Sequence, residues 1–143
     1  MALDQRPHRV AVQQTQEPVY VAGRPTGGVL ANLYSTDSYA VLNVGLPRCL
    51  PEHIKVTLSP KAILVEAELH RAQATVEKER KYILAELPYG RIRRAFPLPE
   101  GDFEPHAVEA HFQNGLLTIT IPTHDRDAYL HEKRGKKKLP EEV

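Results

Sequence analysis

Short segments in which hydrophobic and polar residues alternate follow one another from residue 30 to residue 121. Ala40, Leu42 and Val44, for instance, occupy every second position of one segment. A period of two residues places the apolar side chains on one face of a strand, so each segment predicts a strand with one buried face. The predicted strands span residues 30–35, 39–46, 54–58, 62–69, 91–98, 108–113 and 117–121.

Residues that favour turns separate these segments. The Thr-Asp-Ser run at residues 36–38 predicts a turn, and the Asn-Gly pair at residues 114–115 is typical of a two-residue hairpin. Pro47 and Pro51 are expected to bracket a loop, and Pro122 is expected to end the last strand. About seven short strands with regular turns predict an all-β protein, an immunoglobulin-like antiparallel β-sandwich.

One segment has two readings. Residues 66–87 favour a helix by propensity. Five apolar residues of this segment have helix-compatible spacings: Leu69, Ala72, Val76, Ile83 and Leu87. The first part of the same segment also continues the alternating strand at residues 62–69. Local sequence leaves helix and strand open here.

The chain divides into three parts by composition. Residues 1–28 are rich in Gln, Pro, Arg and Gly and predict a flexible N-terminal arm, which contains the apolar triplets Val10-Ala11-Val12 and Val19-Tyr20-Val21. Residues 29–122 form the predicted sandwich, and residues 123–143 a charged, flexible C-terminal extension.

Composition narrows the function further. The chain has 143 residues and a net charge of +1, without the basic excess typical of nucleic-acid binding. Apolar runs are short, so no membrane partner is expected, and the N-terminus lacks a signal-peptide core. The single cysteine, Cys49, excludes an internal disulfide and indicates a reducing compartment, the cytoplasm. A redox-driven disulfide between two copies through Cys49 is the alternative for this residue.

Catalytic motifs are missing from the sequence. It contains no phosphate-binding G-x-x-x-x-G-K-[ST], and no serine lies in G-x-S-x-G. The seven histidines have no tight metal-ligand spacing, so they are expected to lie on the surface. We therefore predict no enzyme activity, no cofactor and no metal site. A pH effect on assembly through the histidines at 53, 106 and 111 is a further hypothesis.

Three ordered motifs resemble those of the small heat-shock proteins, in their alpha-crystallin domain. Residues 110–117, AHFQNGLL, resemble the motif A-x-x-x-N-G-x-L. Residues 88–101, PYGRIRRAFPLPEG, resemble P-Y-G-x-F-x-R-x-F-x-L-P-E-G, and residues 46–56 resemble L-P-G-x-x-P-E-D-I-K-V. The resemblance covers roughly residues 30–122.

The resemblance implies a dimer of the kind formed by the bacterial and plant branch. There a long loop, here residues 70–90, carries a strand that pairs with the partner subunit. This strand would span residues 82–87 and meet the partner's residues 30–35, which favours strand over helix at that place. The implied interface residues are Leu30, Leu33, Tyr82, Leu84 and Arg94. For Arg94 the alternative is a solvated charge on a strand face.

The family also implies a peptide groove between two strands. Its apolar residues would be Val56, Leu58, Val108, Ala110 and Phe112, and the alternative is that they are simply core residues. Family tails dock an I-x-I/V triplet there, but none follows Pro122. We hypothesise that an arm triplet replaces it, through Val10 and Val12 or through Val19 and Val21. A further departure is Arg48, which stands where the family has Gly.

The function implied by the resemblance is ATP-independent holding of non-native client proteins, which competes with their aggregation. The partners would be such clients and a second copy of the chain, with higher oligomers in doubt because the tail triplet is missing. The alternative is a co-chaperone or scaffold that binds one specific folded partner. The basic run at residues 133–138 is expected to keep complexes soluble, with an acidic or nucleic-acid surface as the alternative.

Overall fold

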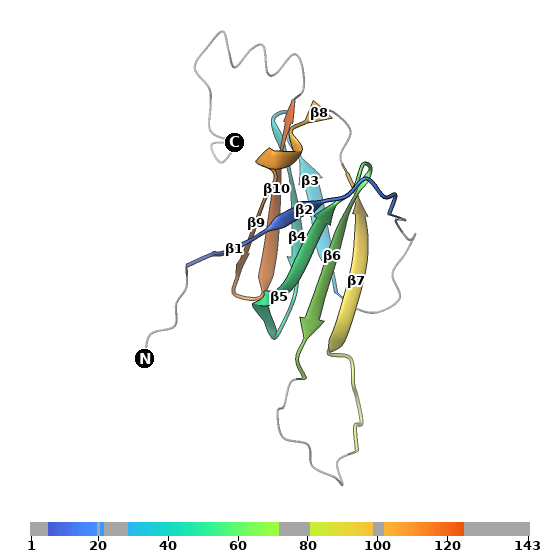
Figure 1. Ribbon diagram of the computed structural model, residues 1–143. Helices are drawn as coiled ribbons and strands as arrows, with labels where there is room; N and C mark the ends of the chain where they lie inside the picture. Colours follow the sequence, from blue (N-terminus) through green and yellow to red (C-terminus); the bar gives the residue numbers. More distant parts are fainter. Residues whose placement is uncertain (1–5, 20, 22–28, 72–80, 99–101, 125–143) are drawn as a thin grey trace.

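The computed structural model describes residues 6–19, 21, 29–71, 81–98 and 102–124. These residues form two stacked β-sheets, and their one helical element is a short 3-10 turn, η1 (Pro105–Ala107) (Figure 1). The prediction of an all-β sandwich is therefore confirmed. The strands are β1 (His8–Val10), β2 (Val12–Gln14), β3 (Ala31–Ser35), β4 (Tyr39–Gly45), β5 (Cys49–Leu58), β6 (Ala62–Leu69), β7 (Gly90–Pro97), β8 (Asp102–Phe103), β9 (Glu109–Gln113) and β10 (Leu116–His124).

The strand order defines two edges at which the sheets lie side by side. The larger sheet has the order β1-β9-β10-β4-β3, with β8 paired to β10, and the smaller has the order β2-β5-β6-β7. All pairings are antiparallel except that of β2 with β5, which is parallel. At one edge β1 and β2 lie against β9 and β5, and at the other edge β3 and β7 are the outermost strands.

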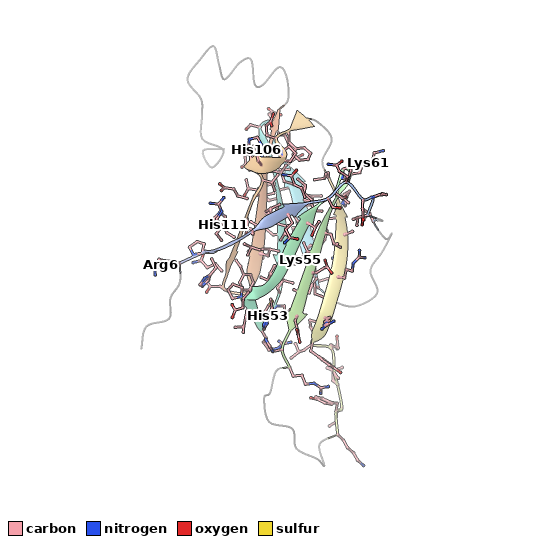
Figure 2. The ribbon with its side chains drawn as sticks, in the orientation of Figure 1. Arg6, His53, Lys55, Lys61, His106 and His111 are labelled. Carbon is pink, nitrogen blue, oxygen red and sulfur yellow. The ribbon has the colours of Figure 1, made fainter. Side chains whose placement is uncertain are left out.

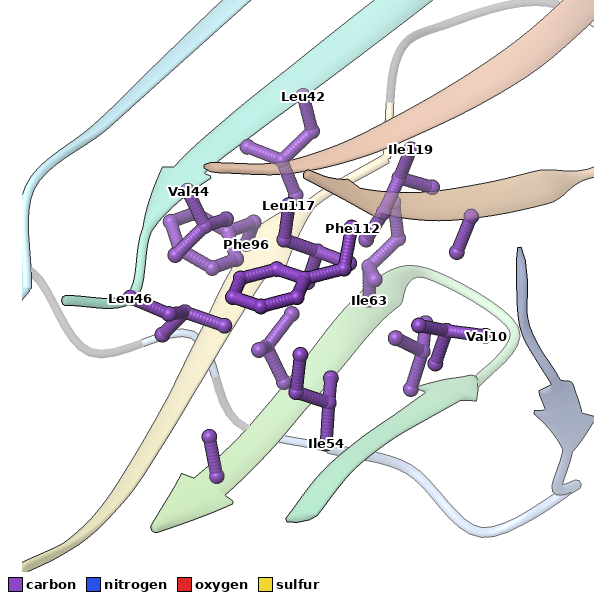
Figure 3. Close-up of a cluster of buried hydrophobic side chains, with 14 of the residues drawn as sticks. Val10, Leu42, Val44, Leu46, Ile54, Ile63, Phe96, Phe112, Leu117 and Ile119 are labelled. Carbon is purple, nitrogen blue, oxygen red and sulfur yellow. The ribbon is translucent and has the colours of Figure 1, made fainter. Parts of the chain in front are cut away.

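The core fills the space between the sheets and follows the predicted alternation. Leu42 and Val44 of β4, Ile63 and Val65 of β6 and Ile119 of β10 are completely buried. Figure 3 shows how side chains from both sheets meet in this cluster. The apolar positions therefore fix which face of each strand turns inward.

Turn chemistry holds the hairpins as predicted. Asn114 and Gly115 both have positive φ angles, 52° and 76°, which join β9 to β10 in a two-residue turn. A Cβ on Gly115 would meet only ordinary contacts, so the backbone angle itself is the reason for glycine there. Between β3 and β4, the Thr36 amide donates to the carbonyl of Tyr39 over 2.8 Å.

Two prolines lie inside strands, where the sequence predicted a loop and a strand end. Pro51 belongs to β5, at a place where the pairing with β6 shifts register between Cys49 and Ile54. Pro122 belongs to β10, beyond the last pair that β10 makes with β9. At both positions the strand pairing requires no hydrogen bond from a backbone N–H, the group that proline lacks, so the strand can continue.

The ambiguous segment is resolved only in part. Residues 66–69 lie in β6, and residues 81–89 form neither helix nor strand in this single chain. Residues 72–80 lie outside the described residues, as do residues 125–143 with the basic run and the tail. Across the described ranges, the structure contains no helix that is long and apolar enough to cross a membrane.

Candidate functional site: the two edges of the sandwich

The first edge is covered by the chain's own N-terminal arm. Residues 8–10 pair antiparallel with β9, with Val10 opposite Ala110. Residues 12–14 pair parallel with β5, with Val12 opposite Val56. The arm therefore leaves one sheet and joins the other within two residues, as Figure 1 shows for β1 and β2. We call this the covered edge.

Val10 is the apolar anchor of the covered edge. Its side chain is only 6% exposed and belongs to the same buried cluster as Ile54 and Phe112 (Figure 3). Val12 is partly buried and packs against that cluster. The arm continues beyond β2, where the Thr15 amide donates to the carbonyl of Leu58 over 2.9 Å. The arm thus adds both apolar contact and backbone hydrogen bonds.

The five residues predicted to line a groove all lie beneath the arm or close to it. Each is buried, and each belongs to the hydrophobic core: Val56, Leu58, Val108, Ala110 and Phe112. All five therefore lie in the core, and their role in a peptide groove stays a prediction. Val10 of the arm packs onto that core at the covered edge, where β1 lies outside β9 and β2 lies outside β5.

The second arm triplet is placed differently. Val19 and Val21 lie in no strand, and Val21 is 39% exposed. Tyr20, between them, lies outside the described residues. Only the first triplet, in strands β1 and β2, has the backbone pairing that a docked peptide needs.

The opposite edge, formed by β3 and β7, carries no additional strand among the described residues; we call it the open edge. Leu30, Leu33 and Tyr34 are exposed there, Leu30 to 84%. Arg94 of β7 spans the two sheets by donating to the carbonyl of Val29 over 2.8 Å, and its guanidinium lies 4.6 Å from the centre of the Phe96 ring. The open edge thus combines exposed apolar side chains with two strands, β3 and β7, whose outer sides pair with no strand of the described residues.

A second exposed apolar stretch precedes β7. Its large side chains are all more than half exposed, and Ile83 is fully so: Tyr82, Ile83, Leu84, Leu87 and Tyr89. The predicted interface residues thus lie on three segments of the chain, which are β3 with the residue before it, residues 82–84, and β7. Strand formation at residues 82–87 needs a second copy, and it remains a prediction for the dimer.

Arg48 holds together the two ends of the segment that contains this stretch. Its side chain donates one hydrogen bond to the carbonyl of His70, over 2.8 Å, and another to the carbonyl of Pro88. The His70 amide donates in return to the carbonyl of Arg48 over 3.1 Å. Arg48 has a φ of 56°, a left-handed angle that favours glycine. An arginine in place of the family's Gly therefore strains the backbone at residue 48, but its side chain forms hydrogen bonds that join residue 70 to residue 88.

Two of the seven histidines meet beside this link. Nε2 of His70 lies 3.3 Å from Nδ1 of His53, and their ring centres are 5.3 Å apart. They are 17 residues apart in the sequence, which is not a typical spacing of metal ligands, so the sequence did not connect them. The pairing of β5 with β6 brings them together. His106 and His111 instead approach the carboxylates of Glu104 and Glu109. Within the described ranges, no group of three or more His, Cys, Asp and Glu could hold a metal ion.

Cys49 is buried at the beginning of β5. Burial, with smaller contributions from the charges of Glu52 and Glu68, raises the pKa of its thiol, while a backbone hydrogen bond from Glu68 opposes the shift. Its Sγ donates to the carbonyl of Leu50 over 3.4 Å. A buried, protonated thiol is a poor nucleophile, so this surrounding does not favour disulfide exchange between copies.

The chain matches the model of the Hsp20/alpha crystallin family over residues 33–136, and it belongs to that family. It is 30% identical over 91 residues to small heat shock protein C2 of Rickettsia felis, which covers 64% of this chain and 57% of that protein. It is 34% identical over 82 residues to the 16.9 kDa class I heat shock protein 1 of Triticum aestivum, which covers 57% of this chain and 53% of that protein. The match thus spans little more than half the length of these relatives.

Solved structures agree with the fold. Heat shock protein 16.0 from Schizosaccharomyces pombe superposes with a TM-score of 0.59 at 21% identity, over 78% of this chain and 94% of that one. The hspA of Xanthomonas axonopodis superposes with a TM-score of 0.57 at 27% identity, over 66% of this chain and 92% of that one. The family resemblance predicted from the three motifs is confirmed.

Proposed function

We propose that this chain is a chaperone that holds unfolding proteins without ATP and prevents their aggregation. The observation that carries the proposal is the covered edge, where an extended segment with apolar side chains is added to both sheets at once. A non-native chain exposes the same two features, apolar side chains and unpaired backbone, so it can take the place of the arm. Holding shifts the population of unfolded chains by mass action and needs no chemical step.

In this proposal the arm and the client compete for the same residues. The arm, through Val10 and Val12, covers the groove residues when no client is present. A client segment with small apolar residues two positions apart replaces it, pairs with β9 and β5, and covers Val56 and Ala110 instead. Because the arm binds the groove reversibly, it prevents the groove from associating with folded proteins or with other copies of the chain.

The first experiment measures heat-induced aggregation of a labile client by light scattering, without nucleotide. The full chain is expected to suppress scattering at near-stoichiometric ratios. A double variant, Val10→Ser with Val12→Ser, weakens the arm's docking and is expected to suppress aggregation at lower temperature than the natural chain. Val19→Ser with Val21→Ser is the matched control, because these valines lie in no strand.

A peptide of residues 6–16 provides the second measurement. Added to the Val10→Ser, Val12→Ser variant, it is expected to occupy the groove and to reduce client binding, whereas the same peptide with both valines replaced by serine has no effect. Failure of the full chain to suppress aggregation for several clients would reject the holding function. It would favour instead a scaffold that binds one folded partner.

We further propose that two copies pair through the open edge. Residues 82–87 of one copy would add a strand beside the partner's β3, which buries Tyr82, Leu84, Leu30 and Leu33 and uses the unpaired side of that strand. Arg94 would lie near this junction.

Light scattering coupled to size exclusion tests the pairing. Leu84→Asp is expected to raise the dimer dissociation constant by about tenfold or more, since Leu84 is 74% exposed in the single chain. Leu116→Asp is the control, since Leu116 is an exposed leucine of β10, and β4 separates that strand from β3. An unchanged dimer in the Leu84→Asp variant would contradict the proposed interface.

A further inference from the structure

We infer that His53 and His70 form a two-histidine site for a divalent transition-metal ion, with Zn²⁺ as the probe. The site lies where β6 ends and the long segment before β7 begins, and Figure 2 shows His53 toward that end of β5. Neither the proposed holding function nor the proposed dimer is needed for this inference.

The geometry of the two imidazoles fits one ion. Nε2 of His70 and Nδ1 of His53 are 3.3 Å apart. Two nitrogens at the usual Zn–N distance and the tetrahedral angle lie about 3.4 Å apart. The rings are tilted by 49° to each other, and both side chains are exposed, so they can turn their lone pairs toward a shared ion and leave room for water. The protein supplies two ligands, and solvent completes the coordination.

The backbone around the pair is fixed, which lowers the cost of bringing two ligands together. His70 is held by two hydrogen bonds with Arg48, one through its amide and one through its carbonyl. His53 lies in β5 beside the register shift, one residue before Ile54, which pairs with Ala67 of β6. Two ligands held close together, one in β5 and one directly after β6, bind as a chelate, because the second bond forms at high effective concentration.

Charges of both signs surround the pair. The guanidinium of Arg48 opposes a cation, but it is engaged by the carbonyls of His70 and Pro88. The carboxylates of Glu52 and Glu68 lie close enough to Cys49 to help raise the pKa of its thiol, so negative charge is present at the same end of the sheet. Imidazole nitrogen is a ligand that Zn²⁺, Ni²⁺ and Cu²⁺ accept readily.

An ion in this position would connect β5 to the end of β6 immediately before the segment with the exposed apolar residues. It would restrain this end of β6 in addition to the hydrogen bonds that Arg48 donates to the carbonyls of His70 and Pro88. Metal binding is therefore expected to slow amide exchange at residues 69–71 and at Arg48.

Isothermal titration of the untagged full chain with Zn²⁺ tests the inference. One ion is expected to bind, and His53→Asn or His70→Asn is expected to weaken binding by about 100-fold, the loss that follows when a chelate becomes a single ligand. His111→Asn is the matched control, since His111 approaches Glu109 and lies on β9. Imidazole resonances of residues 53 and 70 should shift together when the metal is added.

Two outcomes would overturn the inference. Equal affinity in the natural chain and in both variants would place binding elsewhere, and a loss in only one variant would reduce the site to a single surface histidine. Because both side chains are exposed, each variant is expected to unfold at the same temperature as the natural chain when a chelator is present. That control separates a lost ligand from a damaged fold.

Discussion

The two edges of the sandwich present the same chemical problem and handle it differently. Without the arm, both edges would end in strands whose outer backbone groups lack partners and lie next to apolar side chains, a combination that promotes association. At the covered edge residues 8–14 supply the missing pairing from within the chain, and Val10 is 6% exposed. At the open edge Leu30 is 84% exposed and β3 has no partner on its outer side among the described residues. In the proposed function, the covered edge binds a client after the arm has left it, and the open edge pairs with a second copy.

The largest effect on stability is expected from Val10→Asp. A carboxylate cannot remain in the apolar cluster, so the arm should leave the sandwich and expose the residues beneath it. The expected loss in free energy of unfolding is about 2–3 kcal/mol, measured by urea denaturation. Amide exchange at residues 8–14 should rise at the same time. Val19→Asp should leave both quantities unchanged, and an equal loss there would show that the arm does not dock through Val10.

A smaller effect is expected at the open edge from Arg94→Ala. This variant removes the hydrogen bond to the Val29 carbonyl and the contact with the Phe96 ring. The expected loss is about 1–2 kcal/mol in the same denaturation experiment. Arg94→Lys should recover only part of it, because a lysine cannot keep both contacts. Unchanged stability would mean that the open edge is not held together by this side chain.

Arg48→Gly is expected to change stability by less than about 1 kcal/mol. Two hydrogen bonds are lost, but glycine relieves the left-handed backbone angle, so the two effects oppose each other. Amide exchange should nevertheless accelerate at residues 81–89, because the two ends of the segment are no longer joined. Arg48→Ala loses the hydrogen bonds without relieving the angle and should be the less stable of the two variants.

The smallest effect concerns Cys49, at the beginning of the strand behind the covered edge. Its pKa is raised in the folded chain, so the thiol's contribution to stability is complete below the pKa of the unfolded thiol and is lost as the pH rises from there through the raised pKa of the folded thiol. Stability should therefore fall slightly more steeply between about pH 8 and 10 in the natural chain than in Cys49→Ala. Equal slopes would contradict the burial of the thiol.

The sequence predicted the parts of the fold that local patterns determine. The bounds of β6 agree with its apolar segment, and the Asn-Gly pair lies at the predicted hairpin. In these strands one buried face imposes a period of two, and that period is visible in a single chain. The five residues predicted for the groove all lie in the core, because four of them occupy inward positions of β5 and β9 and Val108 directly precedes β9.

Other features depend on which strands pair with each other, and a local sequence pattern does not predict that. The strands β1 and β2 have three residues each, too few to show a period, and they are extended because β9 and β5 offer partners. His53 and His70 meet through strand register rather than spacing. Pro51 and Pro122 were predicted to interrupt strands, but each lies where the neighbouring ladder shifts or has ended.

The pairing of the arm also has a direction. Residues 8–10 run antiparallel to β9, and residues 12–14 run parallel to β5, so both strands of the edge impose one chain polarity on whatever lies across them. A segment that crossed the edge with the opposite backbone direction would pair parallel with β9 and antiparallel with β5, so it would form a different hydrogen-bond pattern with each sheet. The arm thus crosses from one sheet to the other with a single backbone direction, a property that depends on the main chain rather than on the chemistry of the side chains.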